Sequence, residues 1–388
     1  MRSATTANPW FTVTDFVTVV QRIGEDTIAI VVRLERKYHR YTKSAFHVAM
    51  VCKTVQFAPK RPPPLHISSN SCIGGSTINK QYMKKTYHLC LSAGDEAMFR
   101  DMEDYHRGFN YFAIALHKTS SAGLAEAFMA THTHQVIQTD NPAEFMYHFR
   151  RPYSMYFNHK YQRKGKLGEQ EHFSLEVIGY HHLIAAISYV LRNALHHGIA
   201  PIPYAYPHCS ANAFFRREMG KYIDEKVLPK NVIYNHIGRR AEFPDSYKMS
   251  ESGVFLRESV LDVSQVENLF VTPRSFNYYM TRKSSEEWEK EQAKDGNGLA
   301  PVNLLTIENG IQLNDPDKMF FFENGKGDYR KISDLELCTH LDELARSCYR
   351  KHSVYQLTRE EKTKIAEDLY RKHHLPESQI RRCLAFPK

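Results

Sequence analysis

The stretch ATHTHQVIQT, residues 130–139, places two histidines one residue apart at the head of a strand-like run. Residues i and i+2 of a strand point to the same face, so His132 and His134 would present two imidazoles side by side. Two imidazoles in that arrangement can hold one divalent cation, while Thr133 would point into the layer behind the strand. The alternative is that both rings are solvated or hydrogen-bonded on a half-buried strand, in a chain that has 21 histidines.

The segments around this stretch predict an α+β domain, with a small, mainly antiparallel sheet and helices packed on it. The next helix is expected to begin at Asn141-Pro142, because asparagine caps helices and proline is tolerated in their first turn. Arg151-Pro152 would be a kink in this helix or a break between two helices. A later helix is expected to end at Gly198. The expected strands are 86–92, 124–131 and 133–139, and the expected helices are 95–117, 142–161 and 180–197.

The helix expected at 180–197 carries Tyr189 and Asn193, which are four residues apart and therefore lie on one helix face. If that face meets the two histidines, the tyrosine could act as a nucleophile and the amide as a third metal ligand. A single tyrosine on a helix is more often a packing residue with a hydrogen-bonded tip. A tyrosine nucleophile also needs help, since its ordinary pKa is about 10. A nearby cation could stabilise the phenolate and polarise a phosphate for attack.

Between these two elements lies RRPYSMYFNHKYQRKGK, residues 150–166, with six Lys or Arg residues and no acidic residue. Cations bind phosphates and aromatic faces stack on unpaired bases, so this composition suits a single strand or a hairpin loop. A solvated basic helix face with buried aromatic rings would have the same composition. The side chains predicted to contact DNA are Arg150, Arg151, Tyr156, Lys160, Arg163, Lys164 and Lys166.

Five stretches between about Thr86 and Ala211 resemble, in the same order, the motifs of single-tyrosine HUH transposases, most closely those associated with REP elements. They are MFRDMEDYHRGF, ATHTHQVIQT, YSMYFNHKYQRKGKLGEQEHF, ISYVLRNALHHGI and YAYPHCSAN. The resemblance covers about a third of the chain. It implies a ferredoxin-like HUH nuclease domain over residues 83–215.

This resemblance also implies a role for each candidate site residue. His132 and His134 match the two metal-binding histidines, and Asn193 matches the polar residue that completes the site for Mg²⁺ or Mn²⁺. Tyr189 matches the nucleophile that attacks a DNA phosphate, giving a 5′-phosphotyrosine and a free 3′-hydroxyl. Because transesterification conserves the bond energy in the phosphotyrosine, rejoining would need no ATP.

The sequence departs from the pattern of that family at three positions. Thr133 stands in place of an apolar residue, Ala194 in place of a proline and His208 in place of a tryptophan. Thr133 should point away from the metal, so the site could survive that change. The other two could alter the exit from the helix or the contact with DNA. None of the three removes a candidate catalytic side chain.

Outside residues 83–215 the sequence predicts less. Residues 1–82 are interpreted as an extension and linker, in which the β-branched runs 11–20 and 27–34 could pair across a turn at 24–26. Residues 216–310 would be an accessory region. Residues 311–388 should hold a hairpin around Asn324-Gly325 and then helices.

Two of these C-terminal helices begin with capping-box spacing, Ser333 with Glu336 and Thr358 with Glu361. The second of them and the short basic segment SQIRRCLAF resemble a helix-turn-helix. Plain helical packing produces the same pattern.

Composition limits the class of protein. Most of the net charge of +9 lies in residues 1–82, which carry +7, so DNA binding elsewhere must depend on local patches. The apolar runs are too short for a membrane span and the N-terminus lacks a signal-peptide pattern. Seven cysteines without a CxxC pair argue against a zinc ribbon or a disulfide framework. We therefore expect a cytoplasmic monomer or homodimer, nucleoid-associated when bound to DNA and not bound to membranes.

The function expected from these features is metal-dependent cleavage and rejoining of single-stranded or hairpin DNA, in transposition or mobilisation of a repeat element. One alternative is a catalytically silent DNA-binding regulator with the same fold. Another is a rolling-circle or plasmid nickase, which would share the chemistry but act at a replication origin.

Overall fold

The computed structural model describes residues 17–22, 28–33, 84–168, 171–221, 225–282, 286–299, 302 and 332–386. The chain divides into two units, Met1–Asn79 and Lys80–Lys388. In the first unit, strands β1 (Val17–Arg22) and β2 (Ile28–Arg33) pair antiparallel. The pairing predicted for the two β-branched runs is therefore confirmed, while the predicted turn at 24–26 and the linker lie outside the described residues.

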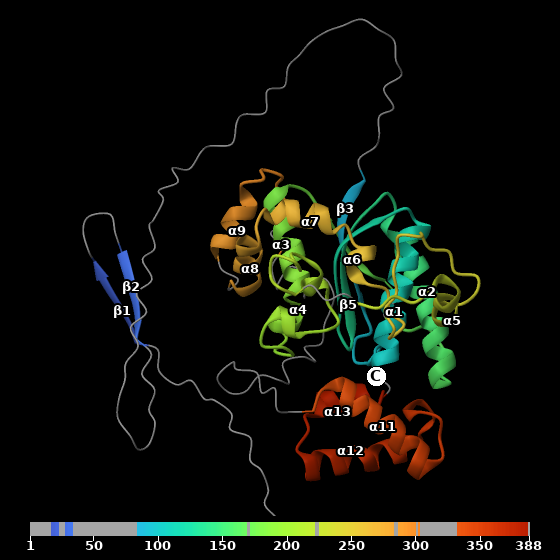
Figure 1. Ribbon diagram of the computed structural model, residues 1–388. Helices are drawn as coiled ribbons and strands as arrows, with labels where there is room; N and C mark the ends of the chain where they lie inside the picture. The colour runs from blue at the N-terminus through green and yellow to red at the C-terminus, as the bar shows by residue number, and fades with distance from the viewer. Residues whose placement is uncertain are drawn as a thin grey trace, which may run out of the picture. The chain divides into compact units, whose positions relative to one another are not determined.

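The second unit is built on a four-stranded antiparallel sheet with the strand order β4-β5-β3-β6 (Figure 1). Its strands are β3 (Lys85–Ser92), β4 (Ala122–Phe128), β5 (His132–Thr139) and β6 (Phe173–Val177). With helices packed on both faces, this is the α+β architecture that the sequence predicts. The strand predicted at 124–131 ends three residues earlier, at Phe128.

The two faces of β5 meet different layers. Helices α1 (Met102–Lys118) and α2 (Pro142–Tyr161) cover one face, and α3 (Tyr180–Leu191) covers the other (Figure 1). Thr133 pairs across the sheet with Phe128, whose ring packs 6.1 Å from Phe112 of α1. Cross-strand partners share a face and neighbours along a strand alternate, so Thr133 faces α1 and α2. His132 and His134 therefore face α3.

Thr133 provides a stability test of this arrangement. Its hydroxyl is buried and has no hydrogen-bond partner within the described part of the chain. Because an unpaired buried hydroxyl costs free energy, we expect Thr133→Val to raise the free energy of unfolding by about 1 kcal/mol. The matched control is Thr139→Val on the same strand, because the Thr139 hydroxyl accepts from the Ser121 hydroxyl at 2.8 Å. That control should lower the free energy of unfolding by about 1 kcal/mol in urea titrations. A destabilised Thr133→Val protein would contradict the prediction.

Two helix boundaries differ from those predicted. The first helix begins at Met102 rather than Asp95, because Asp101 and Asp104 form a capping box that fixes its start. The helix predicted at 180–197 is interrupted at Arg192, whose φ of −93° and ψ of 3° separate α3 from α4 (Asn193–His196). Helix α2, by contrast, runs through Pro152 without a break.

The predicted accessory region packs on the sheet and shares its core. The Asn110 side chain of α1 donates to the Gly253 carbonyl at 2.8 Å and accepts from the Phe255 amide at 2.9 Å. Arg257 pairs with Glu126, a buried carboxylate on β4. The 3-10 helices η1 (Pro203–Ala205) and η2 (Ser210–Ala213) precede this region. Its elements are α5 (Lys230–Ile237), α6 (Arg257–Val260), α7 (Val263–Phe270), α8 (Pro273–Thr281) and α9 (Glu286–Ala293).

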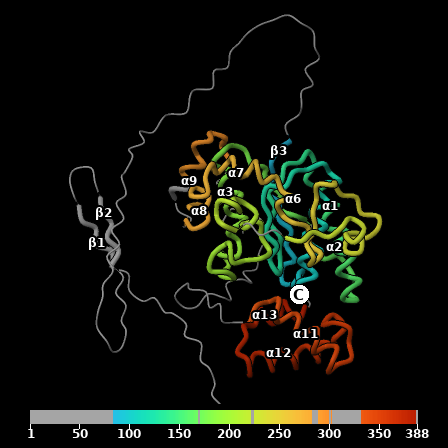
Figure 2. The backbone as a smooth tube through the Cα atoms, viewed as in Figure 1, coloured from blue at the N-terminus to red at the C-terminus, as the bar shows by residue number. Residues whose placement is uncertain are grey.

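The C-terminal helices lie side by side (Figure 2). Their side chains form a second, smaller apolar cluster. These helices are α11 (Asp334–Tyr349), η4 (Val354–Gln356), α12 (Arg359–His373) and α13 (Glu377–Cys383). Both predicted capping boxes, at Ser333 and at Thr358, are confirmed. The hairpin predicted around Asn324-Gly325 lies outside the described residues. Across the described ranges, no helix is both long and apolar enough to cross a membrane.

Helix α13 is the segment that would read DNA in a helix-turn-helix. Two of its polar side chains are buried instead: Arg382 and Gln379 both donate to Asp334 of α11, at 2.9 Å each. These two residues therefore serve the packing of the C-terminal helices, which is the other interpretation of the pattern.

Candidate active site

The four residues predicted to form the metal and nucleophile site lie together in one chain. His132 and His134 project from β5 toward α3, which carries Tyr189, and Asn193 begins α4. The His132 Nε2 atom is 3.0 Å from the Asn193 Oδ1 atom. The rings of His134 and Tyr189 meet edge to face, with centroids 5.5 Å apart. The tyrosine helix thus packs over the histidines of its own chain.

Both histidines are also engaged on their Nδ1 edges. The His134 Nδ1 atom lies 3.1 Å from the His88 Nε2 atom on the neighbouring strand β3. The His132 Nδ1 atom lies 3.0 Å from the hydroxyl of Thr131. His88 thereby enters the cluster, and its ring centroid is 5.7 Å from that of Tyr189.

Burial keeps the imidazoles of His88 and His134 neutral. Loss of solvent, reinforced by His182, lowers the pKa of His88 to about 3. Loss of solvent and then the neighbouring His132 hold the pKa of His134 well below its usual range. A neutral imidazole has a nitrogen lone pair, which is the form that binds a metal ion.

One pair of these donor atoms has the spacing of two ligands of a divalent cation. Two ligands about 2.1 Å from one ion at a right angle lie about 3 Å apart; His132 Nε2 and Asn193 Oδ1 are 3.0 Å apart. The His134 Nε2 atom is buried, and no described residue hydrogen-bonds to it. Over the same described residues, no group of three or more His, Cys, Asp or Glu could hold a metal, so the amide of Asn193 is needed to complete this set.

Sequence reasoning missed three further histidines around Tyr189. They are His88, His196, which stacks on the Tyr189 ring with centroids 5.5 Å apart, and His197, whose ring is 5.3 Å from that of His132. A signal for His88 was available, because it lies in the predicted strand 86–92, which could pair beside the histidine strand. Its register came only from the structure, in which Cys90 pairs with His134.

The site is closed in this structure. His132, His134 and Asn193 are fully buried and Tyr189 is 3% exposed. The start of the tyrosine helix is held by Asp295, whose carboxylate accepts from the backbone amide of His182 at 2.8 Å. A ligand from solvent therefore reaches Tyr189 only after the segments that cover it move.

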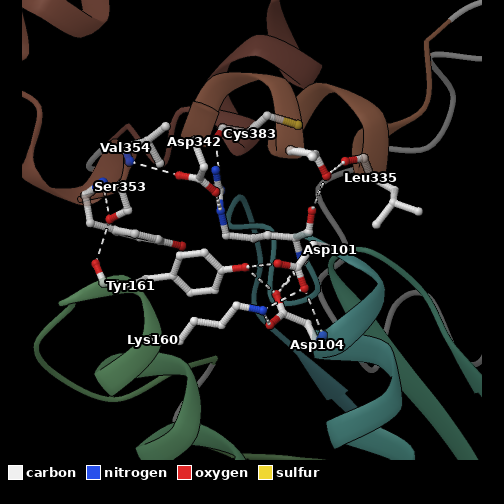
Figure 3. Close-up of polar contacts among 12 residues, drawn as sticks. Asp101, Asp104, Lys160, Tyr161, Leu335, Asp342, Ser353, Val354 and Cys383 are labelled. Carbon is white, nitrogen blue, oxygen red and sulfur yellow. Dashed lines mark hydrogen bonds and ion pairs between the residues drawn. The ribbon is translucent and has the colours of Figure 1, made fainter. Parts of the chain in front are cut away.

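Several of the side chains predicted to contact DNA bind other groups of the protein in this structure. The Lys160 Nζ atom points at two carboxylates at the start of α1 (Figure 3). It lies 2.7 Å from an oxygen of Asp101, the residue that caps the helix, and 3.0 Å from an oxygen of Asp104 in the first turn. The Tyr156 hydroxyl donates to Asp104 at 3.0 Å. Burial and the neighbouring Asp101 raise the pKa of Asp104 to about 6, opposed by Lys160. Lys160 and Tyr156 thus hold α2 to the start of α1.

The remaining cations of this set divide into two groups. Arg163 binds both carboxylate oxygens of Glu96, at 2.7 and 2.8 Å, and Arg150 donates to the Leu167 carbonyl. The exposed members are Arg151, Lys164 and Lys166. These three side chains are the cations of the set that lie at the surface, where Arg151 also donates to the Tyr147 hydroxyl.

His208 stands at the position where the resembled family has tryptophan, and it makes an aromatic contact there. The His208 ring stacks on the Tyr105 ring of α1, with centroids 3.6 Å apart and an interplanar angle of 12°. Burial, with Arg257 nearby, lowers the pKa of His208 to about 3. A neutral ring can fill an aromatic position in this core.

Similarity to known proteins is found among solved structures. No family model matches the sequence, and no curated protein matches it. Among solved structures, the chain is similar to that of a REP-associated tyrosine transposase bound to a REP hairpin. The two share 13% identity over 38% of this chain and 89% of that one, with a TM-score of 0.30.

Proposed function

We propose that this protein cleaves and rejoins single-stranded or hairpin DNA through a 5′-phosphotyrosine on Tyr189, as a transposase does. The observation that carries the proposal is the meeting of Tyr189 with His132, His134 and Asn193 in the layer between sheet and α3. A nucleophile beside three possible metal ligands is an arrangement that can support phosphoryl transfer to a side chain.

In the proposed reaction, the Tyr189 oxygen attacks a DNA phosphorus and a new P–O bond to tyrosine forms. The P–O3′ bond breaks, its electron pair stays on the 3′ oxygen, and the phenol proton is transferred overall to that oxygen. His132, His134 and Asn193 would hold Mg²⁺ or Mn²⁺, which supplies Lewis-acid activation of the phosphate when bound. Rejoining is the reverse step, with a 3′-hydroxyl as the attacking group.

The closed site favours a second candidate, a DNA-binding regulator without turnover. In that protein the histidine cluster would stabilise the core, and the exposed cations Arg151, Lys164 and Lys166 would bind the phosphates. It predicts DNA affinity that is unchanged by His132→Ala, together with no cleavage at any Mn²⁺ concentration.

Covalent adduct formation tests the proposal directly. The full chain is incubated with Mn²⁺ and a library of DNA hairpins with randomised single-stranded flanks, and adducts are resolved under denaturing conditions. We expect an adduct that EDTA prevents, with the nucleotide located on Tyr189 by peptide mass spectrometry. Absence of any adduct across the library, or attachment to another residue, would contradict the proposal.

The exposed cations of residues 150–166 allow a separate prediction about DNA binding. Changing Arg151, Lys164 and Lys166 together to glutamine should weaken binding to single-stranded DNA and reduce its dependence on salt. Because each phosphate contact to a single strand contributes about 0.7 to the salt slope, three contacts should reduce that slope by about 2. Fluorescence anisotropy between 50 and 200 mM salt, about the range over which this effect is large, measures it.

The matched control for this variant is Lys160→Gln. It also removes a cation of the same basic stretch, but one that is bound to Asp101 and Asp104. It should lower the free energy of unfolding and leave the salt slope unchanged. A slope reduced by Lys160→Gln and not by the triple change would show that the assignment of the two groups is wrong.

A further inference from the structure

Each of the two histidines facing Tyr189 has its own partner on the Nδ1 side. For His134 the partner is His88, at 3.1 Å, and for His132 it is Thr131, at 3.0 Å. Both partners, like both histidines, are fully buried. The Nε2 atom of His132 faces Asn193, and the Nε2 atom of His134 is free of hydrogen bonds to any described residue.

We propose that His88 and Thr131 are positioning residues, which hold His134 and His132 with both Nε2 lone pairs directed at one divalent cation. This inference rests on the proposed function and adds two residues that the resemblance does not assign. Neither residue would touch the metal or the DNA.

The physical basis is the tautomer of each ring. A neutral imidazole carries one N–H, so a ring that donates from Nδ1 keeps its lone pair on Nε2. His88 Nε2 can accept from His134 Nδ1. His132 Nε2 lies 3.0 Å from the Asn193 Oδ1 atom, which only accepts, so in this structure Nε2 carries the N–H. Coordination of a cation by His132 Nε2 would require that proton to be on Nδ1, where the Thr131 hydroxyl can accept it. In the opposite tautomer, an N–H would point at the cation and would prevent coordination. Hydrogen-bonded partners of this kind commonly orient metal-binding histidines.

The sheet fixes both partners relative to the rings that they hold. Cys90 of β3 pairs with His134, so His88, two residues earlier, projects from the same face of the sheet. The Thr131 carbonyl accepts from the Ala93 amide at 2.8 Å, directly before β5 begins. Because backbone pairing sets both positions, the two rings are oriented before any metal binds.

The experiment measures Mn²⁺ binding to the full-length protein by isothermal titration calorimetry, and adduct formation as a function of Mn²⁺ concentration. The variants are His88→Phe and Thr131→Val, which remove the acceptor and keep the approximate shape of the side chain. His88→Gln is the conservative variant, because its amide oxygen can reach the position of the lost Nε2. His208→Phe is the matched control, a buried histidine that stacks on Tyr105 outside this cluster.

We expect His88→Phe and Thr131→Val to weaken Mn²⁺ binding by about 10- to 100-fold. The Mn²⁺ concentration that gives half-maximal adduct formation should rise by the same factor, while the rate at saturating Mn²⁺ stays near that of the natural sequence. His88→Gln should restore most of the affinity, and His208→Phe should not change it. A purely structural role would lower the amount of active protein without moving the half-saturating concentration.

Three results would overturn the inference. If the natural sequence binds Mn²⁺ and forms the adduct, but the His88→Phe and Thr131→Val proteins titrate as it does, only this inference fails. If the natural sequence takes up no Mn²⁺, the proposed function fails with it. If His88→Phe does not fold and Thr131→Val binds Mn²⁺ with unchanged affinity, the positioning role is again refuted. Weakened binding in both variants without any adduct would support the inference and refute the proposed function.

Discussion

Replacing Tyr189 by phenylalanine is expected to abolish the covalent protein–DNA adduct while leaving the fold and Mn²⁺ binding intact. The ring would remain against His134 and His196, since both contacts involve ring faces and edges, with centroids 5.5 Å away in each case. Only the oxygen that we propose attacks phosphorus is lost, and no other group on the ring can form the phosphoester. Removal of a covalent nucleophile lowers turnover by about 10³-fold or more.

The matched control is Tyr180→Phe on the same helix. Tyr180 is 50% exposed, and its hydroxyl donates to the Leu269 carbonyl at the helix start. This variant should form the adduct at the rate of the natural sequence. Equal adduct formation by the Tyr189→Phe and natural proteins would exclude Tyr189 as the nucleophile, and a thermal melt of each variant separates that result from unfolding.

The local parts of this site could be predicted from the sequence because they follow from periodicity. His132 and His134 share a face because strand side chains alternate. Tyr189 and Asn193 were expected on one face of a continuous helix. The break at Arg192 changes that helix, yet Asn193 still lies 3.0 Å from His132. A small change in backbone direction therefore did not separate the two residues.

Long-range pairings could not be predicted in the same way. In the sequence, Lys160 and Arg163 look like two phosphate-binding cations. Their partners in the structure are Asp104 and Glu96, which are far away in the sequence because β4 and β5 lie between them. Composition reports that a side chain is charged and says nothing about which opposite charge it meets. His88 was missed for the same reason, since its contact with His134 depends on the pairing of β3 with β5.

The second large effect is expected at Arg100, which joins the C-terminal helices to the start of α1. This arginine is fully buried; its Nε donates to Asp342 at 2.8 Å and its Nη1 donates to the Cys383 carbonyl at 2.9 Å. The rings of Tyr161 and Tyr355 lie 5.5 and 5.4 Å from the guanidinium carbon. Arg100 thus connects α11 and α13 with the sheet domain.

Arg100→Met is expected to lower the free energy of unfolding by about 3–5 kcal/mol, because it leaves the Asp342 carboxylate buried without its cation. Asp342 would keep its hydrogen bond from the Val354 amide, 3.0 Å in length, which does not replace the lost charge. Adding Asp342→Asn to Arg100→Met should recover part of the loss, because a neutral amide needs no counter-charge. Urea titration of the single and double variants measures both effects, and non-additivity of the two changes gives their coupling.

An exposed ion pair provides the control for this argument. Lys85 pairs with Glu176 at 3.1 Å, and its side chain is 63% exposed, so Lys85→Met should lower the free energy of unfolding far less than Arg100→Met does. Limited proteolysis then locates the weakness: in Arg100→Met the C-terminal helices should be cleaved first, since they open without the sheet when their buried connection is lost. Stability within about 1 kcal/mol of the natural sequence, with unchanged cleavage, would show that apolar contacts rather than the Arg100–Asp342 pair hold these helices in place.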